Sequence, residues 1–297
     1  MRDWWQDLTD LVLPAECGGC GAPRSVLCAR CRTALSGAVP CRVRPVPEPS
    51  GLPPVHAAAR YTDEVRATLL AHKERGALAL ARPLGRALAG AVWAGLEAVR
   101  APGVRDGPVL LVPVPSARRA VRTRGHDPAR RIAYAAAGEL RRAGVPARVL
   151  PALRQRRDVA DQSGLGSRQR LANLAGALTL APGCGRLLPA GRVVLVDDLM
   201  TTGASLAEAA RAVRARPDAP SPDRGSGSSI SAPAFVYWGE TGEGRGEQRS
   251  GPARRRAGRR SGRPPVMTGA DSADGNTDAM CAAVVAASPD AFEINRN

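Results

Sequence analysis

The sequence predicts an α/β protein whose parallel β-sheet is flanked by helices, and three observations carry this prediction. Short apolar runs rich in valine and leucine, such as residues 109–114 and 192–196, are typical of strands buried in a parallel sheet. Longer segments with apolar residues at helical spacing alternate with them, for example at 78–99 and 129–143. Loops rich in arginine, glycine and hydroxyl side chains follow two of the strands, which is where such sheets bind ligands.

Residues 1–40 are predicted to form a short helix and a small metal-binding ribbon. Apolar residues from Asp3 to Leu13 follow a helical stripe that Pro14 ends. Two Cys-x-x-Cys pairs come next, and their spacing suits four thiolates around one tetrahedral ion: Cys17, Cys20, Cys28 and Cys31. A structural Zn²⁺ is the predicted ligand, while rubredoxin-like iron and free or redox-active cysteines are the alternatives. Nearby arginines predict either contact with DNA or a plain solvated surface: Arg24, Arg30 and Arg32.

The main domain is assigned to residues 55–214, and a linker joins it to the ribbon. Residues 41–54 are rich in proline, a composition typical of stiff linkers. The domain then starts with a predicted strand at 55–61 and a helix at 63–75 that Gly76 ends. A second helix is predicted over 78–99, with its actual start expected near residue 81.

A strongly basic segment follows the predicted strand at 109–114. Residues 115–127 are predicted to be a loop, which has four arginines within residues 118–124. Guanidinium groups bind pyrophosphate through charge-assisted contacts that are often bidentate, and the alternative is a solvated loop. The predicted pyrophosphate contacts are Ser116, Arg118 and Arg124, whereas His126 is expected to serve as a hydrogen-bonding residue and not as a base.

The most informative run spans residues 193–205. A buried strand ends on two adjacent carboxylates, Asp197 and Asp198, which suit ribose hydroxyls and a divalent cation. The residues after them open a helix whose first amides can bind a phosphate: Thr201, Thr202, Gly203, Ala204 and Ser205. The alternative is a plain turn with a capping box formed by Ser205 and Glu208.

This run resembles the phosphoribosyl-pyrophosphate (PRPP) motif of type I phosphoribosyltransferases. The order of motifs over about residues 1 to 214 is similar to the ComF family, which is associated with competence for DNA uptake. These motifs are the four-cysteine ribbon, Lys73-Glu74-Arg75-Gly76, Val112-Pro113-Val114-Pro115, Arg124-Gly125-His126-Asp127, Gln162-Ser163-Gly164-Leu165 with Arg170 and Asn173, and Asp197-Asp198.

The resemblance implies a type I phosphoribosyltransferase-like fold with an N-terminal zinc ribbon. It implies that the loop of residues 201–205 holds the 5′-phosphate of PRPP, that Asp197 and Asp198 approach the ribose hydroxyls, and that Mg²⁺ binds with PRPP. In a transfer reaction, this acidic pair would be the catalytic pair that stabilises the cation-like sugar. The implied partners are single-stranded DNA and DNA-uptake proteins. The alternative function is a non-enzymatic adaptor in DNA uptake or genome maintenance that binds single-stranded DNA or a helicase.

Composition sets further expectations about partners and location. The net charge of +16 suits polyanionic partners such as DNA or PRPP, whereas an aromatic content of 3% argues against a row of base-stacking side chains. Because we find no secretory signal and no apolar stretch long enough to cross a bilayer, we expect a cytoplasmic protein with no membrane insertion.

Residues 215–297 are rich in proline, glycine, serine and arginine, which predicts a disordered tail or the product of a shifted reading frame. Members of the ComF family place a strand directly after the helix that carries the PRPP motif. Residues 230–238 are the segment expected to replace that strand here.

Overall fold

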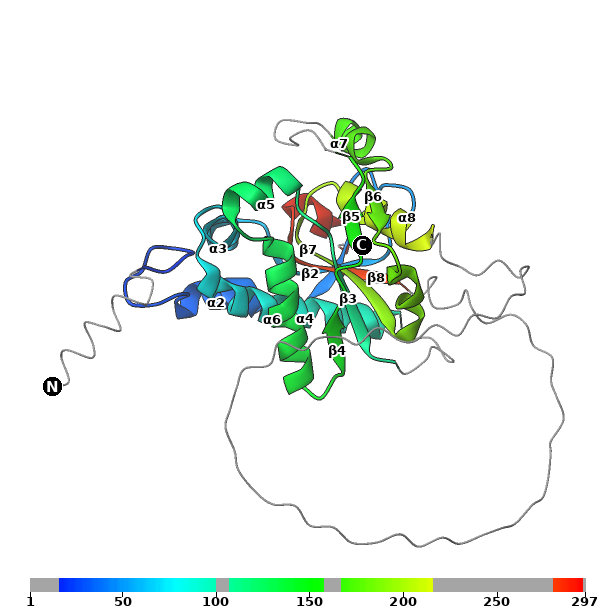
Figure 1. Cartoon of the computed structure of the whole chain (residues 1–297). Helices are drawn as coiled ribbons and strands as arrows, with labels where there is room; N and C mark the ends of the chain where they lie inside the picture. Colours follow the sequence, from blue (N-terminus) through cyan, green and yellow to red (C-terminus); the bar gives the residue numbers. More distant parts are fainter. Residues whose placement is uncertain (1–15, 100–106, 158–166, 216–279, 296–297) are drawn as a thin grey trace, which may run out of the picture. The chain divides into compact units, whose positions relative to one another are not determined.

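Figure 1 shows the computed structural model of the chain, which describes residues 16–99, 107–157, 167–215 and 280–295. Three expectations of the sequence fall outside these residues: the N-terminal helix, the Gln162-Ser163-Gly164-Leu165 motif and the strand at 230–238.

The core of the fold is a six-stranded sheet in which most neighbours are parallel. Its strands stand in the order β1-β2-β8-β7-β3-β4, and β1 alone among them is antiparallel to its neighbour. Their bounds are β1 (Cys41–Val43), β2 (Val55–Arg60), β3 (Val109–Pro113), β4 (Ala147–Val149), β7 (Arg192–Met200) and β8 (Cys281–Ala287). The predicted α/β class with a parallel sheet flanked by helices is therefore confirmed.

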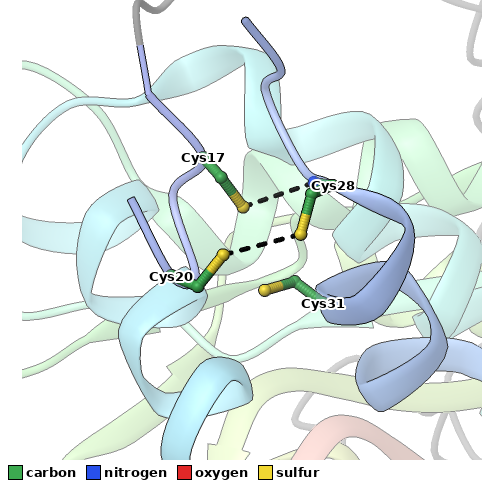
Figure 2. Close-up of side chains that lie close together, drawn as sticks. All are labelled: Cys17, Cys20, Cys28 and Cys31. Atoms are coloured by element: carbon green, nitrogen blue, oxygen red, sulfur yellow. Dashed lines mark hydrogen bonds between the residues drawn. The ribbon is translucent and has the colours of Figure 1, made fainter. Parts of the chain in front are cut away.

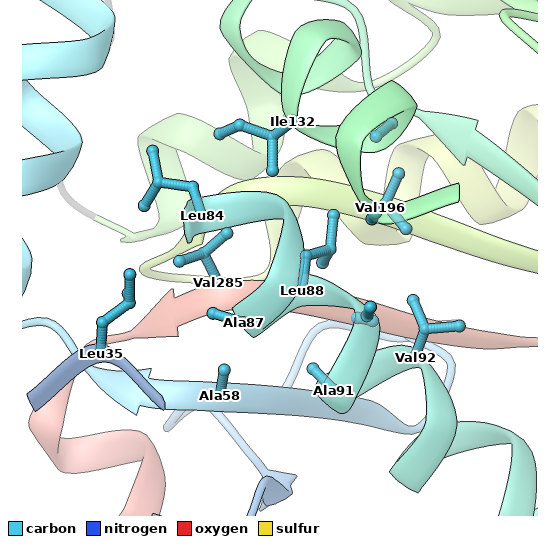
Figure 3. Close-up of a cluster of buried hydrophobic side chains, with 14 of the residues drawn as sticks. Leu35, Ala58, Leu84, Ala87, Leu88, Ala91, Val92, Ile132, Val196 and Val285 are labelled. Carbon is cyan, nitrogen blue, oxygen red and sulfur yellow. The ribbon is translucent and has the colours of Figure 1, made fainter. Parts of the chain in front are cut away.

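Helices cover both faces of the sheet. One face carries α2 (Ala29–Ser36), α3 (Asp63–Glu74), α4 (Ala81–Ala98) and α6 (Pro128–Arg142), and the other carries α8 (Ala204–Arg214). Side chains alternate along β7, so that Val194 and Val196 pack with α4 and α6, whereas Val193 and Leu195 pack with α8. Figure 3 shows the first of these cores, with the leucines of α4 close to the valines of the sheet. Within the described ranges, no helix has both the length and the apolar character needed to cross a membrane.

A second, two-stranded sheet lies next to α8. It pairs β5 (Leu153–Gln155) with β6 (Leu178–Leu180) in antiparallel fashion, and α7 (Ser167–Leu174) connects the two strands. Two side chains of α8 hold it in place, because Glu208 accepts a hydrogen bond of 2.9 Å from the amide of Leu178 and Arg211 donates one of 2.8 Å to its carbonyl. Glu208 and Arg211 also form an ion pair with each other, so both carboxylate oxygens of Glu208 have partners.

The expectation that residues 215–297 lie outside the folded domain is wrong for their last part. Residues 281–287 form β8, which inserts between β2 and β7 and pairs with β7 from Val194↔Cys281 to Met200↔Ala287. Every residue of β8 is buried, as expected for a central strand covered by helices on both faces. The strand beside β7 thus comes from residues 281–287, far beyond the segment 230–238 that was expected to supply a strand.

The expected linker at residues 41–54 also starts with part of the sheet. Residues 41–43 form β1, whose pairs with β2 run from Cys41↔Ala57 to Val43↔Val55. The side chain of Val43 belongs to the core beside α8, so burial of this residue fixes the short edge strand. The main domain thus includes β1 and β8 in addition to residues 55–214.

Candidate functional site

The candidate site lies where β3 ends beside β7. These parallel strands pair from Val109↔Arg192 to Pro113↔Val196. The next strand after β3 lies on one side of this pair and the next strand after β7 lies on the other. Open α/β sheets bind ligands in the crevice that such a reversal of strand order creates. The basic segment after β3 and the acidic motif of β7 therefore belong to neighbouring strands and lie at the same edge of the sheet.

The acidic pair lies within β7, whereas the sequence predicts that the strand ends at this pair. Pairing with β3 stops at Val196, but pairing with β8 continues to Met200, so the backbone of both aspartates stays in a strand. The amide of Asp198 donates a hydrogen bond of 2.8 Å to Oδ1 of Asp197. The side chain of Asp198 points to the side of α3, where it meets Lys73.

Lys73 is a site residue to which sequence reasoning gave no role. Its Nζ lies 3.3 Å from Oδ2 of Asp198, whose side chain is almost entirely buried. The attraction of Asp198 raises the pKa of Lys73, so the ammonium stays charged. One signal was present in the sequence, because Lys73 is the single lysine of a chain that otherwise uses arginine.

The two carboxylates differ in how readily they ionise. Burial raises the pKa of Asp197 well above its usual range, and the negative charge of Asp198 raises it further, while Lys73 acts in the opposite direction. Ionisation of Asp197 would add a negative charge next to Asp198, which Lys73 already neutralises, so it is opposed. Hydroxyl donors of a sugar or a bound cation would favour the ionised form of Asp197.

The loop after β7 leads into α8 through Gly203. This residue has a φ of +73° and is the N-cap of the helix, and a Cβ at this position would come within 3.0 Å of Leu52. Since glycine has no side chain, the N-cap residue does not cover the first amides of α8, where an anion can bind. The capping box of Ser205 and Glu208 is wrong, because Glu208 instead pairs with Arg211 and the amide of Leu178.

The predicted loop after β3 contains a short helix, α5 (Arg118–Arg124), which Gly125 ends with a φ of +75°. Its predicted ligand-binding residues all have partners inside the protein. Ser116 contacts the carboxylate of Asp127, and Arg118 donates a hydrogen bond of 3.1 Å to the carbonyl of Gln155 in β5. Arg124 forms a bidentate ion pair with Glu74, the last residue of α3.

Two histidines connect α3 to the segment that follows α5. His126 has its Nε2 3.2 Å from the carbonyl oxygen of His72 and its Nδ1 3.2 Å from that of Arg124. Its expected role as a hydrogen-bonding residue therefore agrees with its contacts. His72 is completely buried in edge contact with His126, and neither of its ring nitrogens has a hydrogen-bond partner among the described residues.

We expect His72 to make the folded state sensitive to acid. Burial, with the charge of His126, lowers the pKa of His72 from 6.5 to about 4. The unfolded chain therefore takes up a proton first, so this contribution to stability is present above pH 6.5 and is lost as the pH falls toward 4. Between pH 7.5 and 4.5, wild-type protein should lose about 2 kcal/mol more unfolding free energy than His72→Leu. Urea titrations at both pH values measure this difference, and equal losses would contradict it.

The four predicted metal ligands meet in one cluster (Figure 2). Their sulfurs all lie within 4.8 Å of one another, and Cys17 and Cys31 are buried. Zn–S bonds of about 2.3 Å place the sulfurs of a tetrahedral site about 3.8 Å apart, so a small contraction around an ion suffices. The four-cysteine cluster that the sequence predicts is confirmed as a plausible metal site.

The protonation chemistry of these thiols also fits a cation. Although burial opposes it, hydrogen bonds from backbone amides, chiefly that of Cys28, lower the pKa of Cys17 to about 6. The pKa of Cys28 is lowered in the same way, through the amide of Cys31. Burial and the neighbouring sulfurs strongly raise the pKa of Cys31. A bound divalent ion would allow all four sulfurs to ionise together.

The cysteine ribbon packs directly on the helix that supplies Lys73. Cys17, Leu27 and Cys31 share one core with Val65 and Leu69 of α3. A Cβ on Gly19 would lie 3.0 Å from the hydroxyl of Thr68 in α3, so the knuckle approaches the helix closely. Two of the ribbon's arginines also have internal partners, since Arg30 pairs with Glu64 and Arg32 donates to the carbonyl of Leu27.

Comparison with known proteins finds no match, either among protein-family models or among curated proteins.

Proposed function

We propose that the protein binds PRPP and belongs to the phosphoribosyltransferase-like proteins of the ComF type. The observation that carries this proposal is the joint placement of three groups at one strand-order reversal. These are the acidic pair of β7, the uncapped N-terminus of α8 and the arginine of α5. A phosphosugar with a pyrophosphate group requires a hydrogen-bond acceptor for its hydroxyls and two anion sites, which matches this set.

In the proposed complex, each part of PRPP has a defined counterpart. The amides at residues 203–205 bind the 5′-phosphate, and Asp197 and Asp198 accept hydrogen bonds from the ribose hydroxyls. Arg124 faces the pyrophosphate, which enters with the Mg²⁺ that it carries. If the sugar is transferred, a nucleophile of the acceptor forms a bond to C1 while the bond between C1 and the pyrophosphate oxygen breaks and pyrophosphate leaves with the bonding electrons. The acidic pair would stabilise the positive charge that develops on the ring.

Thermal unfolding of the purified protein tests this proposal. With PRPP and Mg²⁺ at about 100 times the dissociation constant, binding stabilises the folded state by about 2.7 kcal/mol and should raise the Tm by roughly 5–10 °C. Ribose 5-phosphate, which has no pyrophosphate, should give a smaller shift. A Tm that PRPP with Mg²⁺ leaves unchanged would refute the proposal.

A second candidate, an adaptor that binds single-stranded DNA, is favoured by one exposed surface. Arg119 and Arg122 of α5 are exposed, as is Arg130 at the start of α6. The guanidinium of Arg130 lies 5.7 Å from the ring centre of Tyr134, which is 49% exposed. Arginines beside an exposed aromatic ring suit a nucleic-acid strand. Binding of a labelled oligonucleotide that weakens with added salt would support this candidate.

A further inference from the structure

The guanidinium of Arg124 is already occupied by a carboxylate of the protein. Its Nε lies 2.8 Å from Oε2 of Glu74, and its Nη2 lies 2.7 Å from Oε1. Both oxygens of one anion thus bind two donors of the same guanidinium. A phosphate group uses the same parallel geometry when it binds arginine. Glu74 therefore occupies the position that a phosphate oxygen pair would take.

This ion pair lies beside the acidic motif. Glu74 follows Lys73, whose ammonium contacts Asp198, and Arg124 is near enough for its charge to oppose the protonation of Lys73. Two cations therefore lie close together at this edge, each with its own carboxylate: Lys73 with Asp198 and Arg124 with Glu74. An anion that replaced Glu74 on Arg124 would therefore lie next to a sugar held by Asp198.

The exchange of Glu74 for a ligand requires little motion of the backbone. His126 lies within hydrogen-bond distance of the carbonyls of His72 and Arg124, which keeps the end of α5 close to the end of α3. The side chain of Glu74 is 46% exposed, so it can turn into solvent, whereas that of Arg124 is only 20% exposed. The mobile partner of the pair is therefore the carboxylate.

We propose that Glu74 is an internal competitor for the pyrophosphate position on Arg124, and that it weakens the binding of ligands that carry a pyrophosphate group. This inference rests on the proposed PRPP function and adds a residue that sets affinity at that site. A ligand with pyrophosphate must displace Glu74, whereas ribose 5-phosphate binds without displacing it. The return of Glu74 to Arg124 also promotes the release of free pyrophosphate.

Isothermal titration calorimetry of Glu74→Gln tests the inference. The amide keeps the shape of the side chain but removes its charge, and exposed ion pairs are weak. We therefore expect PRPP and pyrophosphate, each with Mg²⁺, to bind about two- to fivefold more tightly than to wild type. The affinity for ribose 5-phosphate should stay unchanged. The matched control is Glu64→Gln. Glu64 lies on the same helix as Glu74 and pairs with Arg30 of α2, so its substitution removes a similar charge and should change none of these affinities.

The results separate the inference from the function on which it rests. If PRPP binds wild type and Glu74→Gln equally well, or binds the variant more weakly, the competitor role is refuted while the PRPP site stands. If PRPP binds neither protein, both proposals fail. Glu74→Gln should give no gain in affinity when it is added to Arg124→Ala, because the competitor acts only through Arg124. If Glu74→Gln/Arg124→Ala bound PRPP more tightly than Arg124→Ala alone, the inference would also be refuted.

Discussion

Replacement of both acidic residues, in Asp197→Asn/Asp198→Asn, should weaken PRPP binding by on the order of 100-fold or more. Hydrogen bonds to charged groups contribute about 1.5–3 kcal/mol each, and the two amides would lose this contribution at the ribose hydroxyls. Calorimetry with PRPP and Mg²⁺ measures the loss. An effect of this size is larger than any other binding change expected here, because both substituted side chains contact the ribose in the proposed complex.

The fold should survive this substitution, which makes the binding result informative. Asp197 and Asp198 are like charges next to each other, and burial already opposes the ionisation of Asp197. Their removal relieves this repulsion, although it leaves Lys73 without Asp198. The half-buried stem of Lys73 can carry its ammonium toward solvent. A matched control is Glu139→Gln, which removes a charge from a distant ion pair on α6. Full PRPP affinity in the double variant would contradict the assignment of the site.

Local patterns were sufficient to predict the parts of the site that are adjacent in the sequence. The buried strand, the glycine-containing loop and the amphipathic helix of residues 193–214 follow one another with no gap, so their order alone defines their arrangement. Gly76 was predicted to end α3, and its φ of +67° agrees with that role. The cluster of four cysteines could equally be predicted from the sequence, because the spacing within each Cys-x-x-Cys pair places its two sulfurs close together.

Contacts between distant segments could not be predicted in the same way. Nothing in the sequence places Lys73 beside Asp198, or Glu74 on Arg124, because these pairs depend on how α3 packs against the sheet. The central strand β8 was missed for a different reason. Its apolar run is short and follows a long polar segment, and alanine and valine in such a run do not distinguish a buried strand from a helix. For α5, the one local feature of the sequence that indicates a helix is Gly125, which ends it.

Loss of the metal should have the largest effect on stability. We expect Cys31→Ser to abolish stoichiometric zinc binding and to lower the Tm by roughly 5–10 °C. Cys31 is buried in the core that the ribbon shares with α3 and α4, so the ribbon cannot detach without exposing apolar side chains of both helices. Elemental analysis by mass spectrometry and thermal unfolding measure the two effects. Zinc, and not iron, in the wild-type protein would decide between the two ions that the cysteine spacing allows.

Cys31→Ser should also affect the phosphosugar site, because α3 lies between that site and the cysteine ribbon. The ribbon supports α3 through Val65 and Leu69, and the last turn of that helix carries Lys73 to Asp198. Loss of the metal should therefore weaken PRPP binding even though no cysteine contacts the ligand. Cys41→Ser is the control, because it removes a thiol that lies outside the cluster and should retain both the metal and the affinity. If Cys31→Ser lost its metal but bound PRPP as wild type does, the ribbon would stabilise the fold without positioning Lys73.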